Sequence, residues 1–352
     1  MIAANPLLGT ALHAVGAMSS SACYTPQKRV KGWSWQTYWL TQASFCWFLL
    51  PILGAIFTIP HLWLVLIEAP KSAMLNSFLL GMAYGIGGMT FNFSIRYIGF
   101  SLTYAIAVGL SSVLGTLIPP LVKGSLLQTF TKLGSGWVLA GILIGTAGIA
   151  FCGIAGQLKE KQMNAGGMNT EFSLAKGLLL SLVAGLLSAV YGFSLEAGEP
   201  IAEVAYQHGA GVYRGNVVYI FANIGAFVTT AIYCMRLHVK HRTLGELLAL
   251  PAGPEQASLP VNFLMAALTG ILWYGQFFFY NLAHVRMGSY KFTSWAIHMI
   301  MLVLFSNMIA VLLLEWKGCQ RKTQAIIAFA LATLVAAILA MAYGNYLGGN
   351  PA

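Results

Sequence analysis

Charged residues are scarce in this 352-residue chain, at 8% of all positions, and aspartate is absent, because all nine acidic residues are glutamate. Without aspartate the chain cannot form the aspartyl-phosphate intermediate of one class of ion pump. It also offers few of the carboxylate oxygens that a calcium or magnesium cage requires. We therefore expect neither a phosphorylated pump nor a metal site.

Paired cysteines and catalytic motifs are missing as well. The five cysteines show no paired spacing and no combination with histidine that is typical of a zinc site. The chain has no nucleotide-binding P-loop, no nucleophile elbow and no HExxH helix. We therefore expect no disulfide framework, no cofactor and no enzymatic activity such as ATP hydrolysis or proteolysis.

Long apolar stretches dominate the chain, in which 58% of residues are hydrophobic. Ten stretches are long enough to cross a bilayer, which takes about 20 apolar residues, and their continuous runs differ from the alternation of barrel strands. Because lipid tolerates only backbones whose hydrogen bonds are internal, the sequence predicts an all-α membrane protein of ten transmembrane helices. The predicted spans are 5–25, 35–58, 73–95, 99–122, 135–156, 174–198, 212–236, 260–284, 289–314 and 323–347.

The 19 lysine and arginine residues are spread over the loops, so the net charge of +10 does not indicate a nucleic acid partner. Thirteen of them follow the odd-numbered spans and six lie on the opposite side. The positive-inside rule places the larger set in the cytoplasm and both termini in the periplasm. The partners implied so far are the lipid bilayer and a small solute, and nothing implies a protein partner.

The ten spans divide into two halves of five, residues 1–160 and 161–352, and several residues recur between them. Three pairs share an offset of 189 and two pairs an offset of 169: Gly81 and Gly270, Asn92 and Asn281, Gly99 and Gly288, then Gly16 and Gly185, Ser19 and Ser188. An odd number of spans per half inverts the second copy, as in the inverted repeats of secondary transporters. The alternative is that glycine and asparagine simply recur in membrane helices.

Few ionisable residues lie at membrane depth, where each is a functional hypothesis because burying it is costly. His13 lies in the middle of the first span and His298 within the ninth. Each could be a structural imidazole bonded to a hydroxyl, or a proton-coupling group, since histidine titrates near physiological pH. Glu196, near the end of the sixth span, is a third candidate for proton coupling, and a solvated helix end is its alternative.

Spans 8 and 9 contain the densest cluster of amide and aromatic residues. It consists of Trp273, Tyr274, Gln276, Phe277, Tyr280 and Asn281, followed by Trp295. Amides donate to and accept from hydroxyls while rings cover the apolar face of a sugar, so the cluster favours a neutral polyol. An aromatic belt at the membrane surface would explain the tryptophans but not the amides. We also assign Asn92, the counterpart of Asn281, and His284 to this predicted sugar site.

Four segments together resemble the bacterial L-rhamnose-proton symporters, and the resemblance extends over essentially the whole chain. The segments are SACYTPQKRVKGWSW at 21–35, AGQLKE at 155–160, LWYGQFFFY at 272–280 and SWAIHM at 294–299. The resemblance implies a ten-helix member of the drug/metabolite transporter superfamily that imports L-rhamnose with a proton across the bacterial inner membrane. By this resemblance the family has the same residue as this chain at four candidate positions, which are His13, Gln276, His284 and His298. It has Asn and Lys at the two positions where this chain has Glu196 and Glu199.

Two other functions stay open at this stage. One is export of drugs or metabolites by a transporter of the same superfamily, and the other is a sugar sensor that binds without transport. Proton coupling fits the residues because rhamnose is uncharged, so its uphill import needs a group whose protonation favours one conformational state. His13 is the first candidate for that group.

Overall fold

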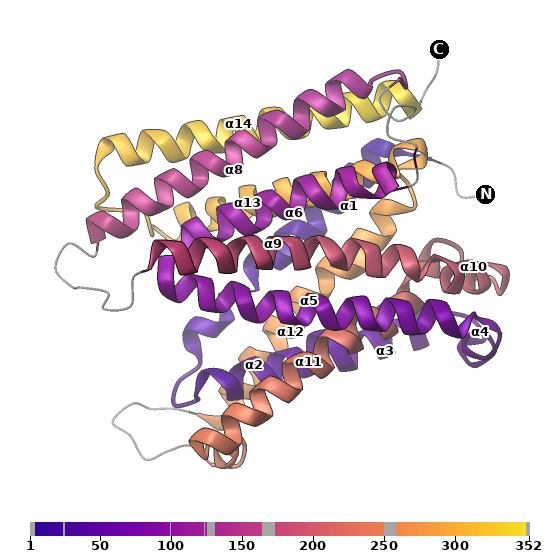
Figure 1. Ribbon diagram of the computed structural model, residues 1–352, viewed down its shortest axis with the longest axis horizontal. Coiled ribbons are helices and arrows are strands. Elements are labelled where there is room, and N and C mark those ends of the chain that lie inside the picture. Colours follow the sequence, from indigo (N-terminus) through magenta and orange to yellow (C-terminus); the bar gives the residue numbers. More distant parts are fainter. Residues whose placement is uncertain are drawn as a thin grey trace. The chain divides into compact units, whose positions relative to one another are not determined.

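The computed structural model describes residues 4–23, 25–98, 100–122, 124, 131–163, 173–249 and 258–349. All regular secondary structure in these residues is helical, which confirms the predicted all-α class, and each of the ten predicted ranges contains a helix (Figure 1). Gly99, one member of the predicted repeat, lies outside the described residues.

The helices form two compact units, each built from separate stretches of the chain. Unit 1 comprises Met1–Ser21, Gly87–Phe193 and Leu282–Ala352, and unit 2 comprises Ala22–Ile86 and Ser194–Asn281. Unit 1 contains α1 (Pro6–Ala22), the second part of α5 (Lys71–Ile98), α6 (Phe100–Val122), α8 (Ser135–Met163), most of α9 (Leu174–Ala197), η5 (Gly288–Thr293), α13 (Ser294–Leu312) and α14 (Arg321–Gly349).

Unit 2 contains shorter elements beside three long helices. Its elements are η1 (Pro26–Arg29), α2 (Trp35–Ala43), η2 (Ser44–Leu49), α3 (Leu50–Thr58), α4 (Leu62–Glu68), the first part of α5, the end of α9, α10 (Glu199–Gln207), η3 (Gly211–Val217), α11 (Val218–His241), η4 (Leu244–Leu247) and most of α12 (Leu259–His284).

Eight helical stretches within the described residues are long and apolar enough to cross a membrane, so the chain is a multi-pass membrane protein. The predicted span 99–122 contains a shorter apolar helix, Leu102–Ile118. Helix α1 has 17 residues, or about 25 Å at 1.5 Å per residue, somewhat less than the hydrocarbon thickness of roughly 30 Å. The count of ten spans therefore stays a prediction.

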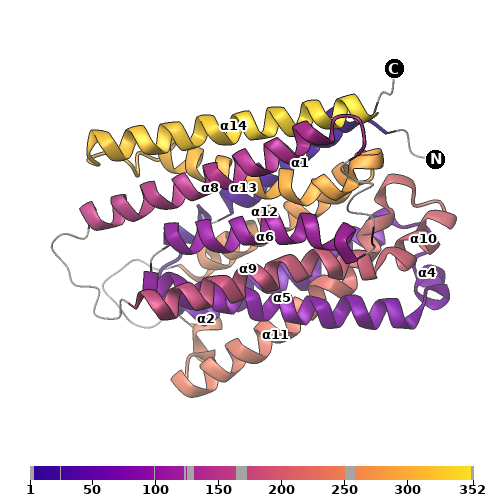
Figure 2. The same cartoon turned by 45° about the horizontal axis from the view of Figure 1, so that its top comes forward.

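Helices α8 and α14 run side by side in unit 1 (Figure 1, Figure 2) and approach each other at backbone distance. A Cβ added at Gly141 would lie 2.8 Å from the Ala337 carbonyl oxygen, and one at Gly134 would overlap the Gly344 carbonyl. Small residues at such positions remove the side-chain layer that otherwise separates two helices. This pair forms one wall of unit 1.

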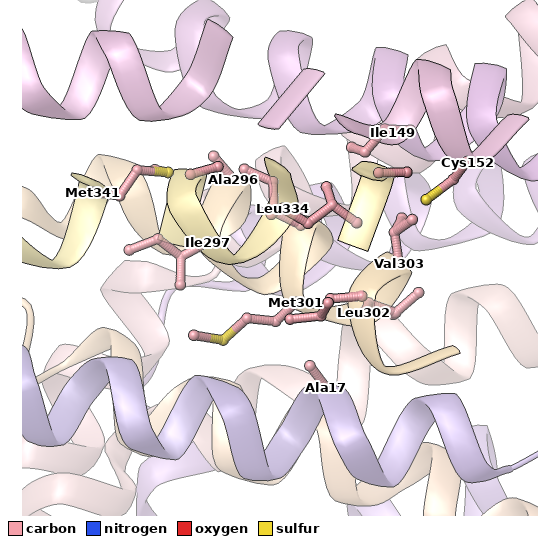
Figure 3. Packing of buried hydrophobic residues seen from close by; sticks show 14 of the residues in the cluster. Ala17, Ile149, Cys152, Ala296, Ile297, Met301, Leu302, Val303, Leu334 and Met341 are labelled. Atoms are coloured by element: carbon pink, nitrogen blue, oxygen red, sulfur yellow. The ribbon is translucent and has the colours of Figure 1, made fainter. Parts of the chain in front are cut away.

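A buried apolar cluster fills unit 1 between α1, α8, α13 and α14 (Figure 3). Leu334 of α14 and Ile149 of α8 lie on one side of α13, while Ala17 of α1 faces Met301 and Leu302 on the other. The first part of α13, Ser294–Leu304, is therefore buried, and a polar residue on it has few routes to solvent.

Several close contacts at glycines hold unit 2 together, and two of them join long helices to neighbouring elements. Gly81 of α5 lies against the backbone of Ala222 of α11. Gly270 of α12 lies against α2 and η2, where an added Cβ would be 2.9 Å from the Gln42 carbonyl oxygen and 2.5 Å from the Cβ of Phe45. The second contact brings α12 directly onto α2 and η2, which carry Trp35, Trp39 and Trp47.

The predicted span 35–58 contains an irregular turn that the sequence analysis did not predict. Element η2 is a π-helix, in which the Leu50 N–H donates to the Phe45 carbonyl five residues earlier. Pro51 follows directly, and proline has no N–H and clashes with the preceding turn of a regular helix. The wider π turn relieves that conflict, and such turns are common at functional sites.

A glutamate anchors the start of α2. The Glu246 carboxylate, carried by η4, accepts hydrogen bonds from the Ser34 N–H and hydroxyl, both at 2.7 Å, and from the Thr37 hydroxyl at 2.5 Å. A negative charge at a helix N-terminus is favourable because the first N–H groups lack helical partners. The orientation of α2 is thereby fixed at its first turn.

Candidate functional site

His13 and His298 form a buried pair in unit 1. Their rings come from the middle of α1 and the first turns of α13, and the ring centroids are 5.6 Å apart with planes inclined at 64°. His13 is 0% exposed and His298 is 2% exposed. At this separation two imidazolium charges would repel strongly in an apolar setting, so the pair is suited to carrying one proton rather than two.

His284 completes a histidine cluster in unit 1. It lies at the C-terminal end of α12, is half-buried, and interacts electrostatically with His13. The sequence analysis assigned His284 to the sugar site and His13 to proton coupling. In the structure, His298 and His284, from two other helices, are therefore both within electrostatic reach of His13.

Hydroxyl groups connect the helices that carry the pair. The Ser21 hydroxyl at the end of α1 donates to the Leu302 carbonyl of α13 at 3.0 Å, and the Ser306 hydroxyl donates to Ser21 at 3.2 Å. Tyr104 of α6 bonds Ser306 at 3.3 Å. Each of these bonds holds α1, α13 or α6 in register beside the histidines.

Trp295, one turn before His298 on α13, has its indole N–H satisfied within unit 1. It donates to the Ser111 carbonyl at 3.0 Å and lies 3.2 Å from the Ser111 hydroxyl. Gly115 makes room for the ring, since an added Cβ would lie 2.5 Å from it. The arrangement makes Trp295 an anchor between α13 and α6, although it was predicted to bind sugar.

Asn92, also predicted to bind sugar, lies half-buried on the part of α5 in unit 1. Its side-chain N–H donates to the Gly88 carbonyl of its own helix at 2.9 Å. This bond occupies one amide donor locally. Asn92 and Trp295 therefore lie in a different unit from the cluster of α12.

Trp273 is part of a corner of three indole rings in unit 2. The ring centroids of Trp273 and Trp39 are 5.7 Å apart, those of Trp273 and Trp47 are 5.5 Å apart, and those of Trp39 and Trp47 are 6.4 Å apart. All three pairs meet edge to face, at 70° to 78°. Three indole rings inclined to one another in this way are a grouping of the kind that covers the apolar face of a sugar ring.

Tyr274 and Gln276 lie beside this corner on α12. Both are buried, and the Tyr274 hydroxyl has no hydrogen-bond partner among the described residues. Gly54 of α3 leaves space for that hydroxyl, because an added Cβ would overlap it. The two side chains supply the polar groups predicted for this segment.

Asn281, the other predicted amide, is engaged in a clamp within unit 2. Its side-chain N–H groups donate to the Val212 carbonyl and to Asn216 Oδ1, both at 3.3 Å, and Asn216 in turn donates to the Thr58 hydroxyl at 3.0 Å. These bonds tie α12 to η3 and α3. Asn281 therefore already has a structural role.

Glu196 is half-buried near the end of α9 and interacts electrostatically with Tyr280 of α12. The neighbouring Glu199 and Glu203 are exposed and pair with Arg214 at 2.6 and 2.8 Å. Exposed pairs of this kind contribute little to stability. The three glutamates thus separate into one half-buried carboxylate and two that anchor η3 to α10.

Comparison with known proteins gives the chain its family. A family model described as "L-rhamnose-proton symport protein (RhaT)" matches residues 2–347. The chain belongs to the L-rhamnose-proton symport protein family. No solved structure matches the chain.

Several L-rhamnose-proton symporters are similar to the chain along nearly their whole length. The symporter of Shigella dysenteriae is 31% identical over 332 residues, which cover 94% of this chain and 95% of the relative. The symporter of Yersinia pestis is 32% identical over 334 residues, 94% of this chain and 96% of the relative. Family members are transporters, so the prediction that the chain is not an enzyme is confirmed.

The sequence analysis missed the part of the tryptophan corner contributed by α2 and η2. Trp39 and Trp47 are buried, and Gln42 lies between them in the sequence. An amide within an apolar span was the signal available, since the same signal singled out Gln276 in span 8. The importance of the Gln42 region is evident only from the ring contacts of Trp39 and Trp47 with Trp273, which join segments more than 200 residues apart.

Proposed function

We propose that this chain imports L-rhamnose, or a related neutral 6-deoxy sugar, by proton symport across the bacterial inner membrane. The observation that carries the proposal is the family match over residues 2–347, which includes the histidine pair and the aromatic and amide cluster. A buried titratable pair and an uncharged sugar site are the two components that proton-coupled import of a neutral solute requires.

In this proposal His13 and His298 hold the coupling proton. The pair is enclosed by apolar side chains of α1 and α13, so protonation changes the charge of an otherwise neutral region. His284 modulates the pair electrostatically. Glu196 is a second proton-coupling candidate because it is half-buried and lies beside Tyr280.

Sugar recognition is assigned to the α12 cluster. Trp273 supplies an aromatic face, and Tyr274 and Gln276 supply a hydroxyl and an amide. Asn281, Asn92, His284 and Trp295 complete the proposed set. Asn281, Asn92 and Trp295 are engaged in hydrogen bonds within the protein. The two asparagines would therefore bind sugar only through their remaining polar atoms, and Trp295 only through its ring face.

Ten spans in two inverted repeats, residues 1–160 and 161–352, form the proposed architecture. Gly81 of span 3 packs against Ala222 of span 7, and its counterpart Gly270 of span 8 packs against Gln42 of span 2. Exchanging matching spans, 3 with 8 and 7 with 2, converts one packed pair of spans into the other, as a repeat requires.

A second pair of contacts in unit 1 has the same relation. The offset of 189 also matches Ile98 to Met287; Ile98 contacts Gly177 of span 6, and Met287 contacts Gly9 of span 1. Unit 1 contains three pairs of matching predicted spans, which are 1 and 6, 4 and 9, and 5 and 10, except for the ends of spans 1 and 6. Unit 2 contains the matching pair 2 and 7. In these four pairs, matching spans therefore belong to the same unit, which supports the drug/metabolite transporter arrangement; span 3 of the fifth pair is divided between the units.

Proteoliposome uptake tests the transport function. Inward L-rhamnose accumulation driven by an inward proton gradient supports the proposal, and outward movement under the same gradient favours the alternative exporter. Sugar binding without counterflow favours the non-transporting sensor.

The proposed periplasmic termini need a separate test. The cysteines within the described residues are all buried, so single introduced cysteines can be labelled selectively. Asn5→Cys should react with an impermeant thiol reagent added outside the inner membrane, and Lys240→Cys should not. The reverse pattern would contradict the orientation.

A further inference from the structure

Gln42 is a buried amide without a hydrogen-bond partner. Its side chain is 0% exposed, and neither Nε2 nor Oε1 has a partner among the residues that the structure describes. Gln36, six residues earlier on the same helix, is also buried, but its Nε2 donates to the Thr243 hydroxyl at 2.8 Å. The difference between these two glutamines is therefore not one of burial.

An unsatisfied amide inside a protein is unusual. The large majority of buried polar groups have a hydrogen-bond partner. A buried donor or acceptor without one costs roughly the full desolvation free energy of that group. In Gln42 both the N–H donors and the carbonyl acceptor of the side-chain amide lack a partner among the described residues. Such a group in a native protein requires an explanation, and an external hydrogen-bonding partner is the most direct one.

The surroundings of Gln42 specify the kind of partner. Trp39 precedes it by one helical turn, and Trp47 follows it within the π turn, so two walls of the tryptophan corner flank the amide in the chain. Trp273 closes the corner from α12. Neither a carboxylate nor an amine belongs to this set, so the matching ligand is neutral.

Two further polar groups of unit 2 have the same character. The Trp47 indole N–H and the Tyr274 hydroxyl are buried, and neither has a partner within the described part of the chain. Together with Gln42 they offer donors and acceptors on elements that also present aromatic faces. That combination is characteristic of sites for hydroxylated rings, in which polar groups fix orientation and apolar groups cover the C–H face.

The backbone holds this group of residues rigidly. Gly270 brings α12 against the Gln42 carbonyl, and the Tyr38 hydroxyl, in the preceding turn of α2, bonds the Thr269 hydroxyl of α12 at 2.9 Å. The π turn of η2 displaces Trp47 from the direction that a regular helix would give it. Preorganised elements of this kind are suited to binding a ligand precisely.

We propose that Gln42, with Trp39, Trp47 and Trp273, forms a sugar subsite in which the Gln42 amide hydrogen-bonds ring hydroxyls and the indoles cover the apolar face. This inference rests on the proposed function, since it names a recognition element of the same transport site. It adds residues of α2 and η2 to a site otherwise assigned to α12.

The test uses Gln42→Met in the purified full-length protein, because methionine retains length and flexibility but has no amide. Binding of L-rhamnose, L-fucose, L-lyxose and L-mannose is measured by quenching of tryptophan fluorescence. We expect the affinity for the best ligand to fall by about tenfold or more, since a hydrogen bond in a dry site is lost. The melting temperature of the sugar-free protein should stay equal or rise, because an unmade amide has been removed.

Gln36→Met is the matched control. It removes a buried amide from the same helix but leaves Thr243 without its partner, so it should lower the melting temperature and leave sugar affinity unchanged. Gln42→Leu provides a second replacement if Gln42→Met folds poorly. A melting temperature that rises while affinity falls is a signature that a purely structural glutamine would not give.

The outcomes separate this inference from the proposed function. Unchanged affinity of both Gln42 variants, with a wild-type protein that binds sugar, overturns the subsite and leaves the proposed function standing. A Gln42-dependent loss of binding for any sugar of the panel supports the subsite even if L-rhamnose is not the preferred ligand. A wild-type protein that binds none of the four sugars overturns both.

Discussion

Polar groups are buried in both units, but their surroundings differ. In unit 1, Ser94 bonds the Gly177 carbonyl at 2.7 Å and Ser181 at 2.6 Å, and Trp295 bonds Ser111. In unit 2, the amide of Gln42, the indole N–H of Trp47 and the hydroxyl of Tyr274 have no partner among the described residues. Side chains without a partner in the described ranges also occur in unit 1, at Ser294 and Trp316, and a satisfied amide also occurs in unit 2, at Asn281. The two units differ in what lies beside the polar groups, which is a histidine pair in unit 1 and a corner of indole rings in unit 2.

In the proposed function, the coupling proton belongs to unit 1 and most of the sugar contacts belong to unit 2. Variants test this assignment: it is contradicted if a unit 1 variant impairs sugar binding rather than proton coupling, or if a unit 2 variant does the reverse. The largest expected effect is that of His13→Ala, which should abolish gradient-driven sugar accumulation because the histidine pair loses one ring. Counterflow, which needs no net proton movement, should persist. Uptake and counterflow in the same proteoliposomes measure both.

His241→Ala is the control for that experiment, because His241 is an exposed histidine at the end of α11. It should retain accumulation. Uphill uptake retained by His13→Ala would remove His13 from the coupling role.

The packing of unit 1 should be sensitive to a single methyl group. Gly134→Ala should destabilise the protein by about 1–3 kcal/mol, since the new Cβ overlaps the Gly344 backbone, and the positive φ of Gly134 adds strain. Gly136→Ala, two residues away, adds a methyl group with nothing within 4 Å and is the matched control. Thermal unfolding in detergent compares them, and equal melting temperatures would contradict the packing described for α8 and α14.

Two amides of α12 should behave differently, although both lie in the cluster predicted from the sequence. Gln276→Ala should weaken sugar binding by about 1–3 kcal/mol if its amide bonds a hydroxyl. Asn281→Ala should instead lower thermal stability, because it leaves the Val212 carbonyl and Asn216 without their partner. Binding and melting measured on both variants sharpen the distinction, and unchanged affinity would move Gln276 to a packing role.

The smallest effects concern the tryptophans. Trp295→Phe loses one indole hydrogen bond to Ser111, about 1 kcal/mol of stability, and should change sugar affinity little. Trp273→Phe should reduce sugar affinity more than stability, because it shrinks one wall of the corner. If Trp295→Phe instead lowered sugar affinity and Trp273→Phe mainly lowered stability, the sugar-binding tryptophan would be in unit 1.

Much of the helical fold follows from the sequence because apolar length is a strong and local signal. The predicted span 174–198 and the observed helix Leu174–Ala197 differ by one residue. The π turn of η2 was not predicted, since its cause combines Pro51 with tertiary packing against α12. The predicted spans 212–236 and 289–314 begin with the 3₁₀ helices η3 and η5, which were not predicted because hydropathy does not distinguish helix types.

The candidate site was predicted in part. His13 and His298 were singled out individually because ionisable residues are conspicuous in apolar spans, but only the packing of α1 on α13 brings their rings to 5.6 Å. Asn281 and Gln276 look alike in the sequence and differ only in their partners. Gln42 was overlooked although an amide in an apolar span was a visible signal, because only the structure shows that this amide has no partner among the described residues.

The most direct test of the account follows external pH when L-rhamnose is added to proteoliposomes without an imposed gradient. Sugar that enters with a proton alkalinises the medium. We predict alkalinisation for the wild type, none for His13→Ala despite active counterflow, and for Gln42→Met a loss at low sugar that recovers at high sugar. Sugar entry without a pH change in the wild type, or undiminished alkalinisation by His13→Ala, would contradict the division of roles between the two units.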